Sequence, residues 1–188
     1  MANVNHSTLT DPYLHEPKGV AAASNGSVYF ADGAGSGDWE HLTHYVGGYV
    51  AFSSSSPTTQ AISTTFSALD PTFSLAENSG FTALSSPNAR LRYDEPEAMV
   101  FDINFASSLR HTGSVDHDIE LALYKNGTAV AGAHVIQTSS SSAWQNMSLT
   151  GQVELNATDY IEIFTKADAS ITLELASAYL TIKGVYKS

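Results

Sequence analysis

Apolar residues recur at every second position through much of the chain after Pro57, and this period limits the fold more than any other feature. A period of two places successive side chains on opposite faces of an extended strand, so it predicts strands with one buried face. The first clear example is the set Met99, Phe101, Ile103 and Phe105. The same alternation recurs in four later stretches, at 119–123, 153–155, 161–163 and 171–175.

Turn-forming residues separate these stretches. Asn126-Gly127 is the clearest signal, because a two-residue type I′ hairpin needs positive φ at both central positions. It predicts a hairpin that joins 120–125 to 128–133. A helix over 171–182 is the one helical alternative, but the alternation there favours a long strand with a bulge near Ser177. About seven or eight strands at such short spacing, without helices, predict an all-β sandwich or barrel.

The first part of the chain has a different composition. All 6 prolines lie between Pro12 and Pro96, and seven of the 13 glycines lie between Gly19 and Gly48. We therefore expect an irregular N-terminal arm over residues 1–56, followed by a β domain over residues 57–188, with the run Ser53–Ser56 as the boundary.

The expected arm carries more apolar side chains than a linker needs. This predicts that the arm attaches to another protein; the alternative is that these side chains pack on the arm's own β domain. The proposed attachment residues are Tyr13, Leu14, Val28, Tyr29, Phe30 and Trp39, with further anchors at Tyr45, Tyr49 and Phe52.

Charge and composition exclude several classes of function. The chain has 8 Lys and Arg against 19 Asp and Glu, a formal net charge of −11, which is unsuited to binding nucleic acid. It has no cysteine, so disulfides and thiolate metal sites are excluded. No stretch approaches the length of a membrane-spanning helix, and residues 1–15 lack the apolar stretch of a signal peptide, so we expect neither.

No motif in the sequence indicates catalysis. The glycine run 33–37 lacks the spacing of a dinucleotide-binding loop, and the pair His41 and His44 has no third metal ligand at a recognised spacing. No G-x-S-x-G nucleophile motif occurs. We therefore expect a protein that is not an enzyme, with no catalytic residue, no cofactor and no resident metal.

Two acidic clusters and one tryptophan leave alternatives open. Asp94, Glu95 and Glu97 form one acidic cluster, and Asp116 with Asp118 forms another. We interpret both as solvated strand entrances, although paired carboxylates about 5–10 Å apart could hydrolyse a glycoside, or could bridge a cation in an oligomer. Trp144, beside the serine run 139–142, could serve as a stacking platform for a carbohydrate.

Two segments of the β domain resemble strand motifs of the C1q/TNF-like jelly roll. They are Glu120-Leu-Ala-Leu-Tyr-Lys-Asn-Gly-Thr128 and Asn156-Ala-Thr-Asp-Tyr-Ile-Glu-Ile-Phe164, and the likeness extends to the closing strand 171–185. The resemblance covers residues 58–187 and implies an antiparallel jelly-roll β-sandwich that forms homotrimers. By analogy, Tyr160, Glu162 and Phe164 would lie at the trimer interface.

The arm segment 14–24, with 28–39, is similar to N-terminal parts of tailed-bacteriophage virion proteins. This resemblance implies a capsid decoration (cement) or head-fibre protein on the capsid surface, bound to the major capsid protein or other virion proteins. An acidic exterior rich in Ser and Thr suits such a surface. The alternative is a tail or neck fibre, or a module that binds a host receptor or surface glycan. We expect no nucleic-acid and no membrane partner.

Overall fold

The computed structural model describes residues 27–31, 37–41, 46–71, 74–84, 90–140 and 143–185. The chain divides into two compact units, Met1–His44 and Tyr45–Ser188. Strands make up the regular structure of the described residues, which contain no α-helix. The predicted all-β class is therefore confirmed.

The first unit contains an antiparallel hairpin of β1 (Ser27–Ala31) and β2 (Gly37–His41). The arm that we expected to be irregular thus includes one regular element. The proposed attachment residues Tyr13 and Leu14 lie outside the described residues, as do residues 33–36 of the glycine run.

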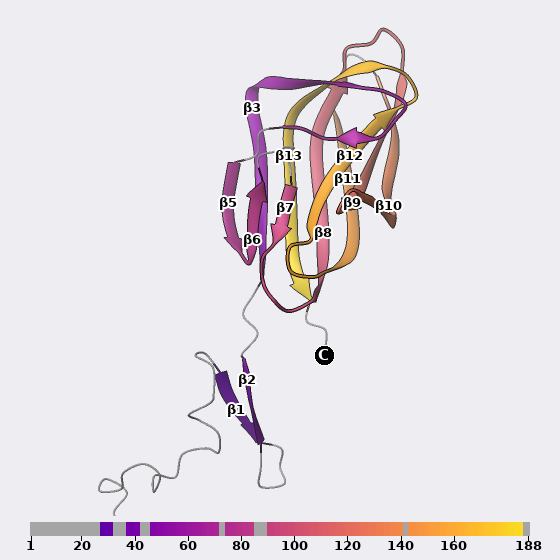
Figure 1. Ribbon diagram of the computed structural model, residues 1–188. Coiled ribbons are helices and arrows are strands. Elements are labelled where there is room, and N and C mark those ends of the chain that lie inside the picture. The colour runs from indigo at the N-terminus through magenta and orange to yellow at the C-terminus, as the bar shows by residue number, and fades with distance from the viewer. Residues whose placement is uncertain are drawn as a thin grey trace, which may run out of the picture. The chain divides into compact units, whose positions relative to one another are not determined.

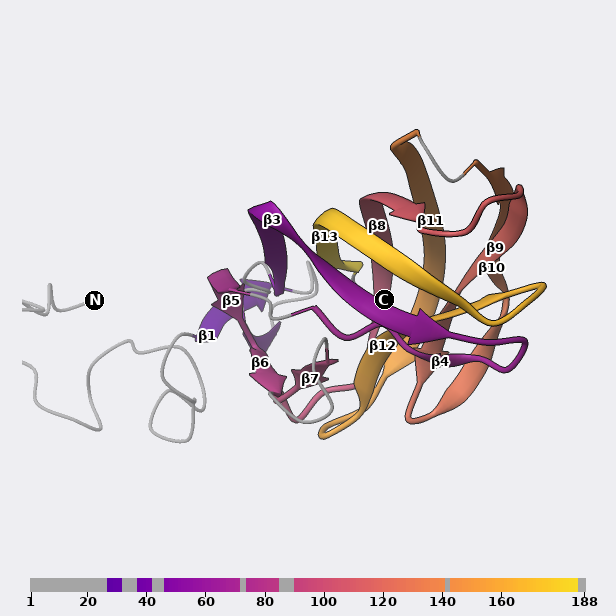
Figure 2. The same ribbon diagram turned by 90° about the horizontal axis from the view of Figure 1, so that it is seen from above.

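The second unit is a sandwich of two antiparallel sheets, seen as two layers in Figure 2. The five-stranded sheet has the order β11-β8-β13-β3-β5, formed by Gln145–Leu155, Met99–His111, Ile171–Val185, Gly47–Ile62 and Ser74–Ser79. The other sheet has the order β10-β9-β12-β7-β6, formed by Thr128–Ser139, His117–Lys125, Tyr160–Ala167, Arg90–Tyr93 and Phe81–Leu84. The short strand β4 (Ser67–Ala68) also pairs with β12. Figure 1 shows the long strands β3, β13 and β8 side by side in the five-stranded sheet.

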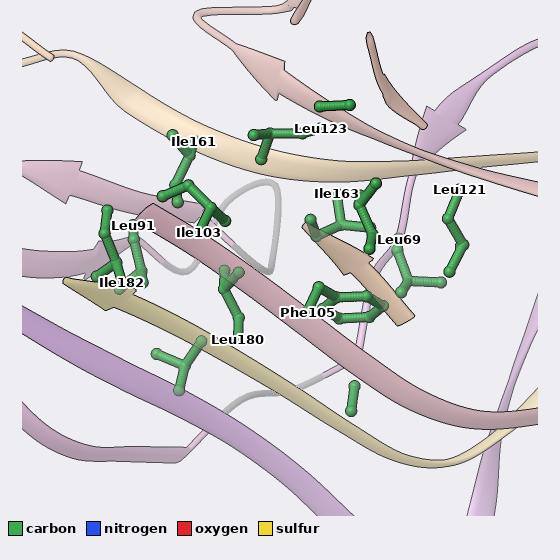
Figure 3. Close-up of a cluster of buried hydrophobic side chains, with 14 of the residues drawn as sticks. Leu69, Leu91, Ile103, Phe105, Leu121, Leu123, Ile161, Ile163, Leu180 and Ile182 are labelled. Atoms are coloured by element: carbon green, nitrogen blue, oxygen red, sulfur yellow. The ribbon is translucent and has the colours of Figure 1, made fainter. Parts of the chain in front are cut away.

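The alternating sequence pattern becomes the inner and outer faces of the strands. Along β8, the side chains from Phe101 to His111 are buried at every second position. Figure 3 shows Ile103 and Phe105 of β8 beside Leu180 of β13, facing side chains of the opposite sheet. Burying two such apolar faces against each other is the main favourable term in folding, at roughly 25 cal/mol per Å² of apolar surface.

Two local predictions are confirmed. Asn126 and Gly127 both have positive φ, 50° and 75°, in the turn between β9 and β10. Glycine adopts this conformation without the steric cost that a Cβ adds. In β13, the pairing register shifts between Leu175 and Ser177, where the bulge was expected.

The expected boundary after residue 56 lies inside β3. That strand starts at Gly47, and its residues from Gly47 to Ser53 pair with the C-terminal half of β13. Val50 belongs to the buried core and Phe52 packs against it. Serine and proline marked a boundary by composition, but the pairing with β13 makes residues 47–56 part of the sandwich.

Candidate functional site

The β1–β2 hairpin brings four of the proposed attachment residues together. Tyr29 lies opposite Trp39, with their ring centroids 5.4 Å apart in an edge-to-face arrangement. Such a cross-strand aromatic pair stabilises a short hairpin. The alternate residues Val28 and Phe30 point to the other face and are 38% and 46% exposed. Within its own unit, the hairpin therefore offers two adjacent apolar side chains for contact.

The proposed trimer residues lie on the outer face of β12, at the centre of its sheet. Glu162 is only 2% exposed, and its Oε1 accepts a hydrogen bond of 2.6 Å from Arg90 Nε. The Arg90 guanidinium also lies 4.5 Å from the centre of the Tyr160 ring. Arg90 thus compensates the buried carboxylate and covers Tyr160 within one protomer.

Phe164 belongs to a second group on this face. Its ring stacks on Tyr124 with centroids 3.9 Å apart, and Tyr124 also contacts Phe66. Lys166 lies 4.6 Å above the Phe66 ring and pairs with Glu120 at 2.9 Å. The outer face of β12 is therefore covered largely by long side chains of its own sheet.

On the outer face of the five-stranded sheet, the charged residues Arg110, Glu174 and Glu154 lie toward the strand ends. Small side chains cover the middle of this face, which we call the small-residue face. Strand register aligns its residues in rows across four strands; two such rows are Ser148, Ala106, Tyr179 and Ala51, and Asn146, Ser108, Ser177 and Ser53. The remaining members used below are Asp102, Asn104, Thr150, Gln152, Thr181 and Lys183.

Charge is nearly absent from the small-residue face. Of its fourteen residues only Asp102 and Lys183 are charged, and they are paired in register on neighbouring strands. Gln152 Nε2 also donates a hydrogen bond of 2.9 Å to Asp102 Oδ1. Among these fourteen, Tyr179 is the one aromatic residue, and it is 42% exposed. Most charges of a chain with a net charge of −11 therefore lie elsewhere.

Sequence reasoning did not identify this face as a candidate site. The signal was present, because the outward positions of the alternating stretches are occupied by Ser, Thr, Asn and Ala. In the sequence alone these residues look like an ordinary solvated surface, because only the register of four strands shows that they lie side by side.

The acidic clusters make local hydrogen bonds. Asp94 accepts 2.6 Å bonds from Thr82 Oγ1 and Arg92 Nε, and Asp118 accepts a 2.7 Å bond from Thr138 Oγ1. No group of three or more metal-ligating side chains occurs among the residues that the structure describes. His44, one of the paired histidines, lies outside them.

Trp144 stands at the entrance to β11 and is 40% exposed. The guanidinium of Arg110 lies 4.6 Å from the centre of its ring, and Glu174 in turn binds Arg110. One side of the indole is thus held by a cation–π contact, which fixes its orientation.

The sequence matches no family model and none of the curated proteins compared with it. Solved structures do resemble it. Eiger TNF from S. frugiperda superposes with a TM-score of 0.53 at 10% identity, covering 77% of this chain and 94% of that one. Murine APRIL gives a TM-score of 0.47 at 14% identity, with 74% and 99% covered.

A third structure, PRD1 vertex protein P5, gives a TM-score of 0.47 at 12% identity, with 75% and 97% covered. At 10% identity, the likeness to Eiger TNF concerns the fold alone. The second unit has a TNF-like jelly-roll fold, as the two strand motifs predicted. Across the described part of the chain, no helix is long and apolar enough to span a membrane.

Proposed function

We propose that this chain is a non-enzymatic structural protein of a tailed-bacteriophage virion. In this proposal the jelly roll is a homotrimeric knob on the capsid surface, and the N-terminal arm attaches it as a decoration or head-fibre protein. The observation that carries the self-association is the small-residue face, and the one that supports attachment is the exposed pair Val28 and Phe30.

Small side chains allow another protein surface to approach the sheet closely. Ser, Ala, Thr and Asn lose little rotamer entropy on burial, and the near absence of charge keeps the cost of desolvation low. Depletion of charge around a central tyrosine is also typical of the core of a protein–protein interface. We therefore place the largest trimer contact around Tyr179.

The residues of β12 remain a second proposed contact. Tyr160 and Phe164 are partly exposed and could touch a neighbouring protomer. Glu162 is already buried against Arg90 within one protomer, so we expect it to orient its neighbours and to contribute little contact area.

The hairpin supports attachment by a different route. Val28 and Phe30 each gain roughly 1.5–3 kcal/mol when fully buried. Two such side chains on one face of a two-stranded element suit docking onto a flat, preassembled shell, where the hairpin edge can add backbone hydrogen bonds.

Light scattering on the full chain tests self-association. We expect a mass of three times 20.0 kDa at micromolar concentration. Tyr179→Arg should shift the mass to one protomer, because it introduces a charge at the centre of the contact. Ile136→Arg is the matched control: Ile136 is an exposed residue of the other sheet, so this variant should keep the wild-type mass. A wild-type monomer would contradict the proposal.

Particle binding tests the virion role. A chain with Val28→Ser and Phe30→Ser should remain folded and lose binding to capsids assembled without it. Unchanged binding of this double variant would exclude the hairpin as the attachment site. Selective binding to tails or necks would favour the alternative tail or neck fibre.

The exposed, oriented indole of Trp144 favours a second candidate, a module that binds a host surface glycan. A glycan array probed with the wild-type chain and with Trp144→Ala separates the two candidates. Glycan binding that depends on Trp144 would support the binding module over the decoration protein.

A further inference from the structure

Two histidines, His111 and His117, lie at the end of the sandwich where β8 ends and β9 begins. His111 is fully buried: its Nε2 lies 2.8 Å from the carbonyl oxygen of Ser139, and its Nδ1 accepts a 3.0 Å hydrogen bond from the backbone N–H of Gly113. Since Nδ1 accepts, Nε2 is the ring nitrogen that can donate to the Ser139 carbonyl oxygen. The His117 ring packs edge-to-face on it, with centroids 5.2 Å apart.

His117, the first residue of β9, is held by a carboxylate from a nearby loop. Its Nδ1 lies 2.7 Å from Oδ1 of Asp168, in the loop between β12 and β13. This hydrogen bond lowers the pKa of the Asp168 carboxyl group, so the carboxylate stays ionised near neutral pH. With Nδ1 occupied, Nε2 is the remaining polar atom of His117. It can accept from a hydroxyl when neutral and donate to one when protonated.

An open cavity of about 760 Å³ lies at this end, and His117 is one of its lining residues. This volume falls in the range of small-molecule sites. Its apolar lining includes Ile62, Ile171 and the exposed Val115. Hydroxyl groups supply most of the polar lining: Ser63, Ser67, Thr112, Ser114, Ser170 and Thr172.

The charges around the cavity restrict the ligand. Among the described residues that line it there is no Lys or Arg, and the one titratable residue of that lining, His117, is already paired with Asp168. Exposed Asp116 and Asp118 stand on either side of His117 in sequence, in a chain with a net charge of −11. An anionic ligand would meet repulsion and no counter-charge, whereas hydroxyls of a ligand can both donate to and accept from the six side-chain hydroxyls.

We propose that this cavity binds a neutral sugar ring, with His117 and the surrounding hydroxyls bonding its hydroxyl groups and Val115 covering an apolar face. The site differs from the Trp144 platform, because Trp144 is not a lining residue. No Phe, Tyr or Trp is among the described residues that line the cavity, so we count on no stacking with the sugar and expect millimolar dissociation constants. The inference does not depend on the trimer or on the virion role.

The test is an NMR titration of the ¹⁵N-labelled full chain. Glucose, galactose, mannose and N-acetylglucosamine are each added to about 100 mM, which saturates a site of low-millimolar dissociation constant. N-acetylneuraminic acid is the anionic comparison. We expect at least one neutral sugar to shift the amide signals of Gly113, Ser114 and Ser170 in a saturable way, and the anionic sugar to bind more weakly.

Two matched variants locate the site. Ser170→Trp fills the cavity from an exposed loop position and should weaken binding at least tenfold. Ala157→Trp adds the same side chain to the exposed loop at the opposite end of β12 and should leave binding unchanged. The proposal is overturned if no neutral sugar gives saturable shifts, if the anionic sugar binds best, or if Trp144→Ala abolishes binding while Ser170→Trp keeps it.

Discussion

Replacing Asp159 by asparagine should destabilise the protein at neutral pH and have almost no effect at pH 2. Asp159 joins the two segments whose sequences resemble jelly-roll motifs. Its Oδ1 accepts a 2.6 Å hydrogen bond from Asn126 Nδ2 in the β9–β10 turn. Its Oδ2 accepts a 2.8 Å bond from the backbone N–H of Asn156 and lies 2.8 Å from Lys125 Nζ.

The size of the effect follows from the pKa of Asp159. Burial alone would raise this pKa, but the hydrogen bonds from Lys125, Asn156 and Asn126 outweigh burial and lower it from 3.8 to about 2. A lowered pKa means that the carboxylate stabilises the fold above the unfolded pKa, and that this contribution is lost as the pH falls toward 2. The linkage corresponds to at most about 2.5 kcal/mol, or about 1–2 kcal/mol after screening by water.

Urea denaturation at pH 6, 4, 3 and 2, at one protein concentration, measures this contribution. Asp159→Asn should lower the free energy of unfolding by about 1–2 kcal/mol at pH 6, and the difference should shrink between pH 4 and pH 2. Asp116→Asn is the control, because it makes the same charge change at an exposed residue, and it should stay within about 0.5 kcal/mol of wild type. A difference between Asp159→Asn and wild type that is as large at pH 2 as at pH 6 would refute the linkage.

Three further results are expected. Phe105→Ala removes a buried ring from between the sheets and should cost about 3–5 kcal/mol in urea denaturation; a loss below about 1 kcal/mol would contradict its place in the core. A chain beginning at Tyr45 should unfold cooperatively, whereas one beginning at Pro57 lacks half of β3 and should fail to give a cooperative transition by circular dichroism. Arg90→Ala should lower the free energy of unfolding by about 3 kcal/mol, because it leaves the Glu162 carboxylate buried and unpaired. Glu162→Ala should lower it less, because the Arg90 side chain that remains can turn toward water. The opposite order in urea denaturation would disprove this.

The short strands show where sequence patterns stop being informative. The strands β4, β6 and β7 have 2, 4 and 4 residues, too few for an alternation to stand out from the surrounding sequence. They form because long neighbours supply a partner: Arg90 and Leu91 of β7, for example, pair with β12. The boundary of the arm was misplaced for a similar reason, since Ser53–Ser56 lies in β3 only through its pairing with β13.

The candidate surfaces also differ in whether the sequence alone reveals them. The exposed apolar residues of the hairpin could be named from sequence, because Val28 and Phe30 stand out in a segment rich in glycine. The small-residue face could not, since its rows join residues as distant as Ser53 and Asn146. The cavity lined by His117 could not be predicted from the sequence either, because His117 contacts Asp168, which is 51 positions away in the chain.

Local patterns in the sequence were enough to predict the class of structure, the hairpin at Asn126-Gly127 and the bulge near Ser177. These features depend on local physics: the alternation of a strand, the φ angles that a turn requires and the chemistry of neighbouring residues. The tertiary structure alone decided which strands are neighbours, which side chains share a face and where the cavity lies. Pairing and packing join residues far apart in the chain, and no local period records which partners they find.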